Sequence, residues 1–194
     1  MAHLAEPKFR LARPIDARAV ANLHADSWRR HYRGAYSDVF LDGDVFADRL
    51  AVWTDRLATP DPRRCTILAE QDGLVGFANT FLDHDPTWGA LLDNLHVADG
   101  HKRRGIASRL LALTAEAVIE RSKRAALYLW VLEQNSDARA FYQARGGRCV
   151  ERGPVSPPGR IASRITGSPA KLRYAWPELT ALVGQRRQAV HDTA

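Results

Sequence analysis

The sequence predicts one mixed α/β domain built around a single sheet. Its length of 194 residues, with 45% hydrophobic and 26% charged residues, suits one globular domain. The spacing of its apolar residues changes several times between the helical period and the alternation typical of strands. No internal repeat is found. We therefore expect the domain to span residues 9–182, with flexible tails at residues 1–8 and 183–194.

The first sixty residues predict one strand and two helices. Residues 9–13 alternate until Pro14, which is typical of a short strand ended by proline. Asp16 stands where a helix N-cap is expected, ahead of a helix that reaches about residue 31. Apolar residues over 46–57 recur at steps of four, three and four, which predicts a second helix that prolines then stop.

The middle of the chain predicts antiparallel strands. The apolar runs 65–69 and 74–82 flank an Asp72-Gly73 dipeptide, which is a strong hairpin signal. A loop over 83–89 is expected to lead into a strand over 91–97. The remaining predicted elements are a helix from Ile106, a buried strand over 126–132, a short helix capped by Asn135 and ended by Gly146-Gly147, a strand over 148–152, a loop insert over 153–170 and a last strand over 171–176.

Composition and charge narrow the class of protein. The net charge is +6 and the pI is about 9.7, which favours a polyanionic partner. Cys65 and Cys149 form no Cys-x-x-Cys motif, and no His-Glu-x-x-His motif occurs, so no metal site is expected. The longest apolar run has eight residues, too few for a membrane span, and no secretory signal is visible at the N-terminus. We expect a cytoplasmic protein with no membrane partner.

The stretch with the clearest chemistry is the basic segment between the strand over 91–97 and the following helix. Lys102-Arg103-Arg104 precede Gly105, and the helix opens at Ile106. A helix start exposes unpaired N–H groups and a partial positive charge, and a glycine there lets the backbone approach a ligand closely. This pattern predicts a site for a phosphate or diphosphate. A P-loop and the three-glycine dinucleotide fingerprint are both absent.

Three segments in the same order resemble the GCN5-related N-acetyltransferases, or GNAT enzymes. Lys102 to Ala107 match the family's Arg/Gln-x-x-Gly-x-Gly/Ala loop except for lysine at the first place. Leu95-His96-Val97 resemble the strand segment that splays from its neighbour. Asn135-x-x-Ala138-x-x-Phe141-Tyr142 is similar to the second cofactor segment, and the opening over 15–34 also resembles many bacterial members. The resemblance covers roughly residues 9 to 176.

The resemblance implies a fold, a cofactor and a set of site residues. The fold would be a central, mostly antiparallel sheet flanked by helices, and the cofactor would be acetyl-CoA. Its diphosphate would lie on the backbone of Arg103 to Ser108, the N–H of Val97 would stabilise the oxyanion, Asn135 would hold the pantetheine arm, and Tyr142 would protonate the departing thiolate. The implied cofactor-binding residues are Leu95, His96, Val97, Lys102, Arg103, Arg104, Gly105, Ile106, Ala107, Ser108, Asn135 and Tyr142.

The resemblance says least about the residue that acts as general base and about the identity of the acceptor. The position of the family's usual glutamate is Leu91, and Asp93, two residues on, should face the same side of the strand, whereas His96 should face the other. Asp93 is therefore the candidate base, with a water relay as the alternative. Trp28 and Tyr32 would line the acceptor site, although helical spacing also suits simple packing. The acceptor is an unidentified small-molecule or peptide amine, and the protein a monomer or homodimer.

Structural roles, rather than roles in binding or catalysis, also remain open for some of these residues. Tyr142 is also what a core aromatic looks like, and Asn135 is a capping residue by propensity. The expected activity is transfer of acetyl from acetyl-CoA to a primary amine in a ternary complex. The alternatives are a non-catalytic acyl-CoA sensor of the same fold and a basic nucleic-acid-binding module, the latter disfavoured because no nucleic-acid-binding motif accompanies the basic cluster. We expect no nucleic-acid partner.

Overall fold

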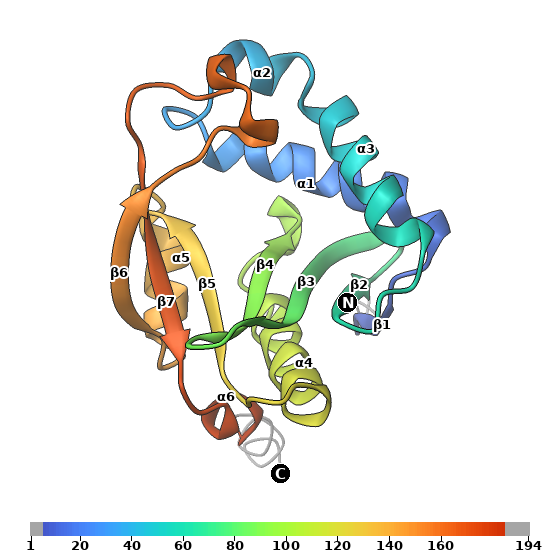
Figure 1. The fold of residues 1–194 in the computed structure, drawn as a ribbon. Helices are drawn as coiled ribbons and strands as arrows, with labels where there is room; N and C mark the ends of the chain where they lie inside the picture. Colours follow the sequence, from blue (N-terminus) through green and yellow to red (C-terminus); the bar gives the residue numbers. More distant parts are fainter. Residues whose placement is uncertain (1–5, 185–194) are drawn as a thin grey trace.

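A computed structural model describes residues 6–184, which form one seven-stranded sheet with helices on both faces (Figure 1). The sheet order is β1-β2-β3-β4-β5-β7-β6, and every neighbouring pair is antiparallel except β4 and β5. This confirms the predicted mixed sheet. The strands are β1 (Lys8–Leu11), β2 (Arg64–Glu70), β3 (Leu74–Asp85), β4 (Gly89–Val97), β5 (Leu127–Leu132), β6 (Arg148–Pro154) and β7 (Ala170–Trp176).

The helices divide between the two faces of the sheet. On one face, α1 (Ala17–His31) packs against α3 (Val45–Ala58), with α2 (Asp38–Asp42) beside them (Figure 1). Their apolar sides meet the sheet in two clusters around Trp53 and Trp28. On the other face, α4 (Ile106–Arg121), α5 (Ser136–Gln143) and α6 (Thr180–Gly184) cover the largest core cluster. The site described below lies where these two layers meet at β4 and β5.

Several boundaries differ from the sequence prediction. The loop expected over 83–89 is wrong, because β3 continues to Asp85 and β4 already begins at Gly89. Gly89 has φ of +82°, and a Cβ there would lie 2.4 Å from the Ala126 carbonyl oxygen, so only glycine fits this tight turn. The short helix α2 was not expected from the sequence. Val183 belongs to α6 rather than to a tail, and the predicted tails otherwise fall largely outside the described residues.

The insert over 153–170 is a folded segment with two short 3-10 turns, Pro158–Arg160 and Ala162–Arg164. It forms a β-bridge between Ile165 and Tyr36, and Arg164 pairs with Asp48 of α3 at 2.5 Å. The insert therefore connects the β6–β7 edge of the sheet to the α1–α3 layer, which Figure 1 shows at the top of the molecule.

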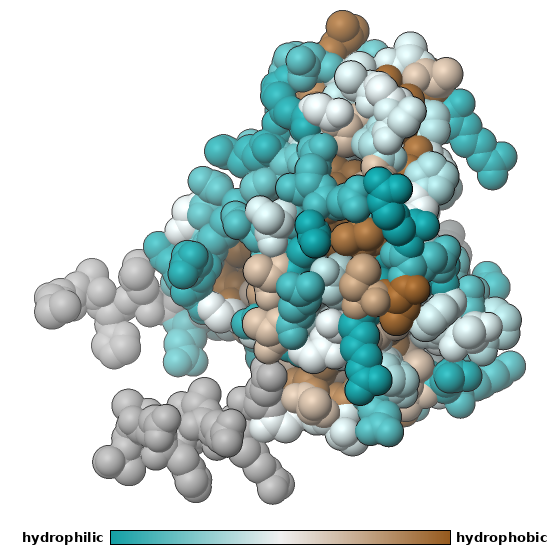
Figure 2. Space-filling model, turned by 90° about the vertical axis from the view of Figure 1, so that its left-hand side faces the viewer, coloured by the Kyte–Doolittle hydropathy of each residue, from teal (hydrophilic) through white to brown (hydrophobic). Residues whose placement is uncertain are grey.

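One of the two edge strands of the sheet is β6, whose side chains are almost all exposed. It carries Arg148, Glu151 and Arg152, and charged side chains on an edge strand oppose pairing with another chain. Figure 2 views the molecule from this side, and its surface there is largely hydrophilic with small hydrophobic patches.

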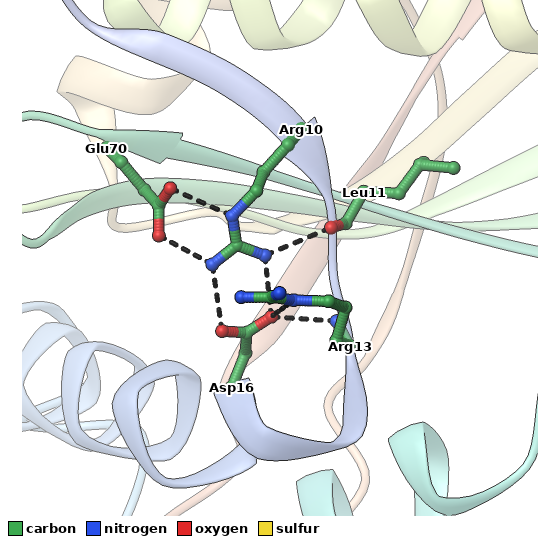
Figure 3. Close-up of polar contacts among 5 residues, drawn as sticks. All are labelled: Arg10, Leu11, Arg13, Asp16 and Glu70. Atoms are coloured by element: carbon green, nitrogen blue, oxygen red, sulfur yellow. Dashed lines mark hydrogen bonds and ion pairs between the residues drawn. The ribbon is translucent and has the colours of Figure 1, made fainter.

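An arginine inside a carboxylate pair ties the first strand to the first helix (Figure 3). Arg10 of β1 donates two hydrogen bonds to Asp16, at 2.7 and 2.9 Å, and two to Glu70 of β2, at 2.8 and 2.6 Å. Asp16 also accepts from the Arg13 N–H at 2.7 Å. Asp16 is the N-cap residue of α1, as predicted, but its side chain makes no capping bond and serves as an ion-pair anchor instead.

The Arg10 anchor predicts a pH-dependent loss of stability in Arg10→Met. Because Arg10 hydrogen-bonds both carboxylates, the pKa values of Asp16 and Glu70 lie below their usual range. Their contribution is present above pH ~4 and is lost as pH falls through the lowered pKa values. Urea unfolding should show Arg10→Met about 1–3 kcal/mol less stable at pH 7, with the difference shrinking at acid pH. Arg13→Met, which removes only a 3.9 Å exposed contact to Asp16, is the control; equal losses in both variants would contradict the prediction.

Candidate active site

The parallel pair β4–β5 opens into a gap after only two residue pairs. Ala90 pairs with Leu127 and Leu91 with Tyr128, and beyond them the strands diverge (Figure 1). The expected splay of the strand ending at Val97 is therefore confirmed. The Ala98 N–H donates to β3 at 2.8 Å, and N–H directions alternate along a strand. The N–H groups of Leu95 and Val97 consequently point away from β3, toward the gap.

The basic segment between β4 and α4 forms an open cradle of backbone amides. A 3-10 turn (Asp99–His101) leads to Arg103, with φ of +61°, and Gly105, with φ of +78°, is the N-cap of α4. No side chain caps this helix, so its first N–H groups stay available to a ligand. A Cβ built on Gly105 would meet no other atom within 4 Å. The cradle thus has the space, the amides and the positive helix end that a diphosphate requires.

The side chains of the predicted cradle residues differ in their exposure and in their contacts. Arg103 and Arg104 are exposed, and in the described part of the chain no carboxylate lies within 4 Å of either. Lys102 instead lies 2.8 Å from Asp99 and 3.0 Å from the His31 ring of α1. Ile106 is 2% exposed and belongs to the core, so only its backbone faces the cradle.

Arg145, which sequence reasoning did not single out, reaches the cradle from the turn that follows α5. Its guanidinium donates to Ser108 Oγ in the first turn of α4, through Nε at 3.2 Å and also through Nη2. It also lies 3.9 Å over the Phe141 ring. Burial lowers the pKa of Arg145, and no carboxylate of residues 6–184 pairs with it. The cradle is therefore flanked by a cation on the α5 side as well as by Arg103 and Arg104.

Asn135 and Tyr142 lie on α5, across the gap from β4. The Asn135 Oδ1 accepts from the Ala138 N–H at 3.2 Å, which confirms its capping role. Tyr142 is 8% exposed and packs on Tyr174 and Trp176 of β7. Burial raises the pKa of Tyr142, with a further contribution from Tyr32 at the end of α1, so its hydroxyl stays protonated.

A β-bulge in β4 changes which side chains face the α1–α3 layer. Asn79 pairs with Asn94 and Thr80 with Leu92, which leaves Asp93 as an extra residue. Arg56 of α3 consequently contacts both Asp93 Oδ2, at 2.8 Å, and Asn94 Oδ1, at 3.2 Å. The prediction that His96 faces the side opposite Asp93 is wrong, because the bulge restores His96 to the α1 side.

His96 packs against the buried His24 on this face. Its Nδ1 lies 2.7 Å from Ser27 Oγ of α1, and its ring centroid is 4.7 Å from that of His24. Burial lowers the pKa of His96 to about 3 and that of His24 well below its usual range, so both rings are neutral. The role implied for His96 toward the cofactor can involve only its backbone, since its side chain is turned into this cluster.

Trp28 and Tyr32 belong to an aromatic cluster at the end of α1. Their ring centroids lie 5.2 Å apart, and Tyr36 is 5.0 Å from each. Arg49 lies 4.2 Å over Trp28, which is 7% exposed and thus mainly a packing residue. Tyr32 is less covered, and burial, followed by the Asp93 carboxylate, raises its pKa to about 12.

Comparison with known proteins places the chain in a family. Residues 21–147 match the model of the acetyltransferase (GNAT) family, so the chain belongs to this family. A probable N-acetyltransferase of Mycobacterium tuberculosis is 28% identical over 142 residues, covering 71% of this chain and 78% of that protein.

Solved structures share the fold. The PaiA N-acetyltransferase of Thermoplasma acidophilum, in complex with coenzyme A, has a TM-score of 0.68 at 16% identity and covers 89% of this chain and 100% of that one. A Salmonella typhimurium structure with its cofactor acetyl-CoA has a TM-score of 0.62 at 15% identity and covers 89% and 94% of the two chains.

Residues 6–184 hold neither a metal-binding cluster nor a membrane-spanning helix. No group of three or more His, Cys, Asp or Glu side chains is arranged to hold a metal ion there. None of the helices in that range has the length and apolar character to cross a bilayer. Cys65 is buried and Cys149 exposed, and neither forms a disulfide.

Proposed function

We propose that this protein transfers the acetyl group of acetyl-CoA to a primary amine, by direct attack in a ternary complex, in the cytoplasm. The observation that carries the proposal is the continuity of the β4–β5 gap with the amide cradle at the start of α4. A thioester carrier with a diphosphate needs both features. Membership of the GNAT family, and solved relatives that hold coenzyme A or acetyl-CoA, support the same assignment.

The residues present fit the cofactor. The backbone of Arg103 to Ser108 would hold the diphosphate, with Lys102, Arg104 and Arg145 adding positive charge around it. The edge of β4 at Leu95 to Val97 and the side chain of Asn135 would hold the pantetheine arm. Acetyl-CoA supplies the acetyl group as an activated thioester.

The chain supplies a hydrogen-bond donor, a proton donor or a proton acceptor for each charge that develops in the reaction. The N–H of Val97, with that of Leu95 beside it, would stabilise negative charge on the acetyl oxygen, because neither amide is used by β3. Tyr142 would donate its proton to the departing sulfur, since burial keeps the phenol protonated. Asp93 would accept the proton of the amine directly or through water, and Trp28 and Tyr32 would border the acceptor.

A non-catalytic acyl-CoA sensor is the second candidate, and Leu91 is the observation that favours it. Leu91 occupies the position of the family's usual glutamate and pairs with Tyr128 at the mouth of the gap. A sensor would bind acetyl-CoA and release no thiol with any amine. The exposed Arg103 and Arg104 would also suit nucleic acid, but such a protein would ignore acetyl-CoA.

Gly105→Val tests the cradle. Acetyl-CoA at about 100 times its dissociation constant should stabilise the wild type by about 2.7 kcal/mol, which is a Tm rise of about 5–10 °C for a chain of this size. A valine would fill the open space in front of Gly105, so this rise should disappear. Gly73→Val, also at positive φ with no atom near, lies in the β2–β3 turn and is the control for backbone strain. An undiminished rise in Gly105→Val would refute the cradle.

Tyr142→Phe should lower kcat by about 10- to 1000-fold, because the thiolate would depart without its proton donor. The dissociation constant of acetyl-CoA, measured by calorimetry, should change little. Tyr174→Phe is a matched control, since Tyr174 is a buried neighbour whose hydroxyl has no hydrogen-bond partner in the structure. Unchanged turnover in Tyr142→Phe would remove this tyrosine from the mechanism.

Asp93→Asn should lower kcat/KM by about 10²- to 10⁴-fold and remove the acid limb of the pH–rate profile, because the amide cannot accept a proton. Asp85→Asn makes the same change of charge on β3, where the carboxylate accepts from the N–H groups of Thr87 and Trp88. It should keep the wild-type profile. Superimposable profiles for Asp93→Asn and the wild type would show that another group, or water alone, takes the proton.

A further inference from the structure

The α1-side face of β5 and β7 carries four stacked aromatic and cationic side chains, which we call the cation–aromatic ladder. The Lys171 Nζ lies 4.5 Å from the centre of the Trp130 ring, and the Arg173 guanidinium lies 4.6 Å from it. Arg173 also lies 5.1 Å from the Tyr128 ring. The alternate residues of both strands, such as Leu129 and Leu172, are buried in the core on the α4 side, so the ladder occupies the opposite face.

The ladder runs along one border of the β4–β5 gap. Tyr128 marks the last pair of β4 and β5, Trp130 pairs with Arg173, and Leu132 pairs with Lys171 farther along the opening. Leu132 packs into the same cluster as Trp28, so Lys171 lies next to the aromatic end of α1. Asp93 of β4 forms the other border. The same opening therefore has a carboxylate on one side and two cations on the other.

Charge on the ladder is only partly neutralised. Arg173 pairs with Glu151 of β6 at 3.1 Å, but its buried Nε has no hydrogen-bond partner. Lys171 has no carboxylate within 4 Å in residues 6–184. Burial, followed by the nearby Arg173, lowers the pKa of Lys171, and Glu151 of β6 offsets this lowering only in part. Among residues 6–184, Lys171 thus stands without a carboxylate partner on the β5–β7 side of the gap, whereas Asp93 on the other side pairs with Arg56 at 2.8 Å and Arg173 pairs with Glu151.

An anionic group of the acceptor would complete this arrangement. It would pair with Lys171, and a charge-assisted hydrogen bond in a partly desolvated place is among the stronger polar contacts. Its amine would then extend across the gap toward Asp93. A polyamine has no group to offer the ladder, and its second cation would be repelled by Lys171 and Arg173.

We propose that Lys171, supported by Arg173, binds a carboxylate of the acceptor, and that the acceptor is a small amino acid rather than a polyamine or a simple amine. This inference rests on the proposed acetyl transfer and names its substrate class. The Trp130 ring lies against the Lys171 ammonium and would hold it on the β5–β7 side of the gap, where it would receive the carboxylate of a compact zwitterion.

The test is thiol release from acetyl-CoA with a panel of amino acids, each paired with its carboxamide, together with spermidine. The amine of a carboxamide is less basic and so more often unprotonated, which means that a preference for the free acid cannot come from amine reactivity. In the wild type, kcat/KM for the best amino acid should exceed that of its carboxamide by about 10- to 100-fold.

Lys171→Met keeps the apolar stem over Trp130 and removes the charge. It should bring that ratio close to one, through a higher KM for the amino acid with kcat less affected, and Lys171→Arg should restore the preference. Lys123→Met, at an exposed position after α4, is the matched control and should keep the wild-type ratio.

Two other outcomes would refute either the carboxylate site or the acetyl transfer on which it rests. If spermidine or the carboxamides react as well as the amino acids, or if Lys171→Met keeps the preference, the carboxylate site is refuted while acetyl transfer stands. If no amine releases thiol although acetyl-CoA raises the Tm, the transferase itself is refuted and the acceptor class falls with it.

Discussion

The structure depends on one interruption in its hydrogen-bonded sheet. β4 and β5 stop pairing after Leu91 and Tyr128, although both strands continue for several residues. Backbone N–H groups away from water are almost always paired, so an interior edge of this kind is costly unless something fills it. In the acetyl transfer proposed above, the amides of Leu95 and Val97 would be taken by the pantetheine arm of coenzyme A, whose own amide groups suit such an edge.

The gap is kept open by contacts on both sides rather than by the strands alone. Leu132 at the end of β5 packs into the aromatic cluster of α1, and Gln134 donates to the Arg33 carbonyl at 2.7 Å. On the other side, the bulge at Asp93 and the pairing of Arg56 with Asp93 and Asn94 fix β4 against α3. Each strand is held by a different partner, so the two cannot close on each other without loss of contacts to the α1–α3 layer.

The sequence was sufficient for features that depend on local signals. Gly105 after two arginines, and Asn135 at a helix start, point to a cradle and a cap because helix termini have fixed chemical needs. It was insufficient for features that depend on register. One extra residue at Asp93 places His96 on the opposite face of the sheet from the one expected, and the residues around Asp93 carry no sequence signal for a bulge. Arg145 and Lys171 could not be singled out either, because their significance comes from partners 37 and 41 residues away, Ser108 and Trp130.

The positions of the basic residues say more about the ligands of this protein than its net charge does. An excess of +6 would suit any polyanion, but the structure places two pairs of basic residues in surroundings with different needs. Arg103 and Arg104 stand exposed at a helix start, where mobile cations can attract phosphates from solution without a large desolvation cost. Lys171 and Arg173 are half-buried and held on aromatic rings, where a cation is costly to place and contributes mainly to selectivity. A protein that needed only to attract coenzyme A would gain nothing from the second pair, so its position beside the gap is best explained by the molecule that receives the acetyl group.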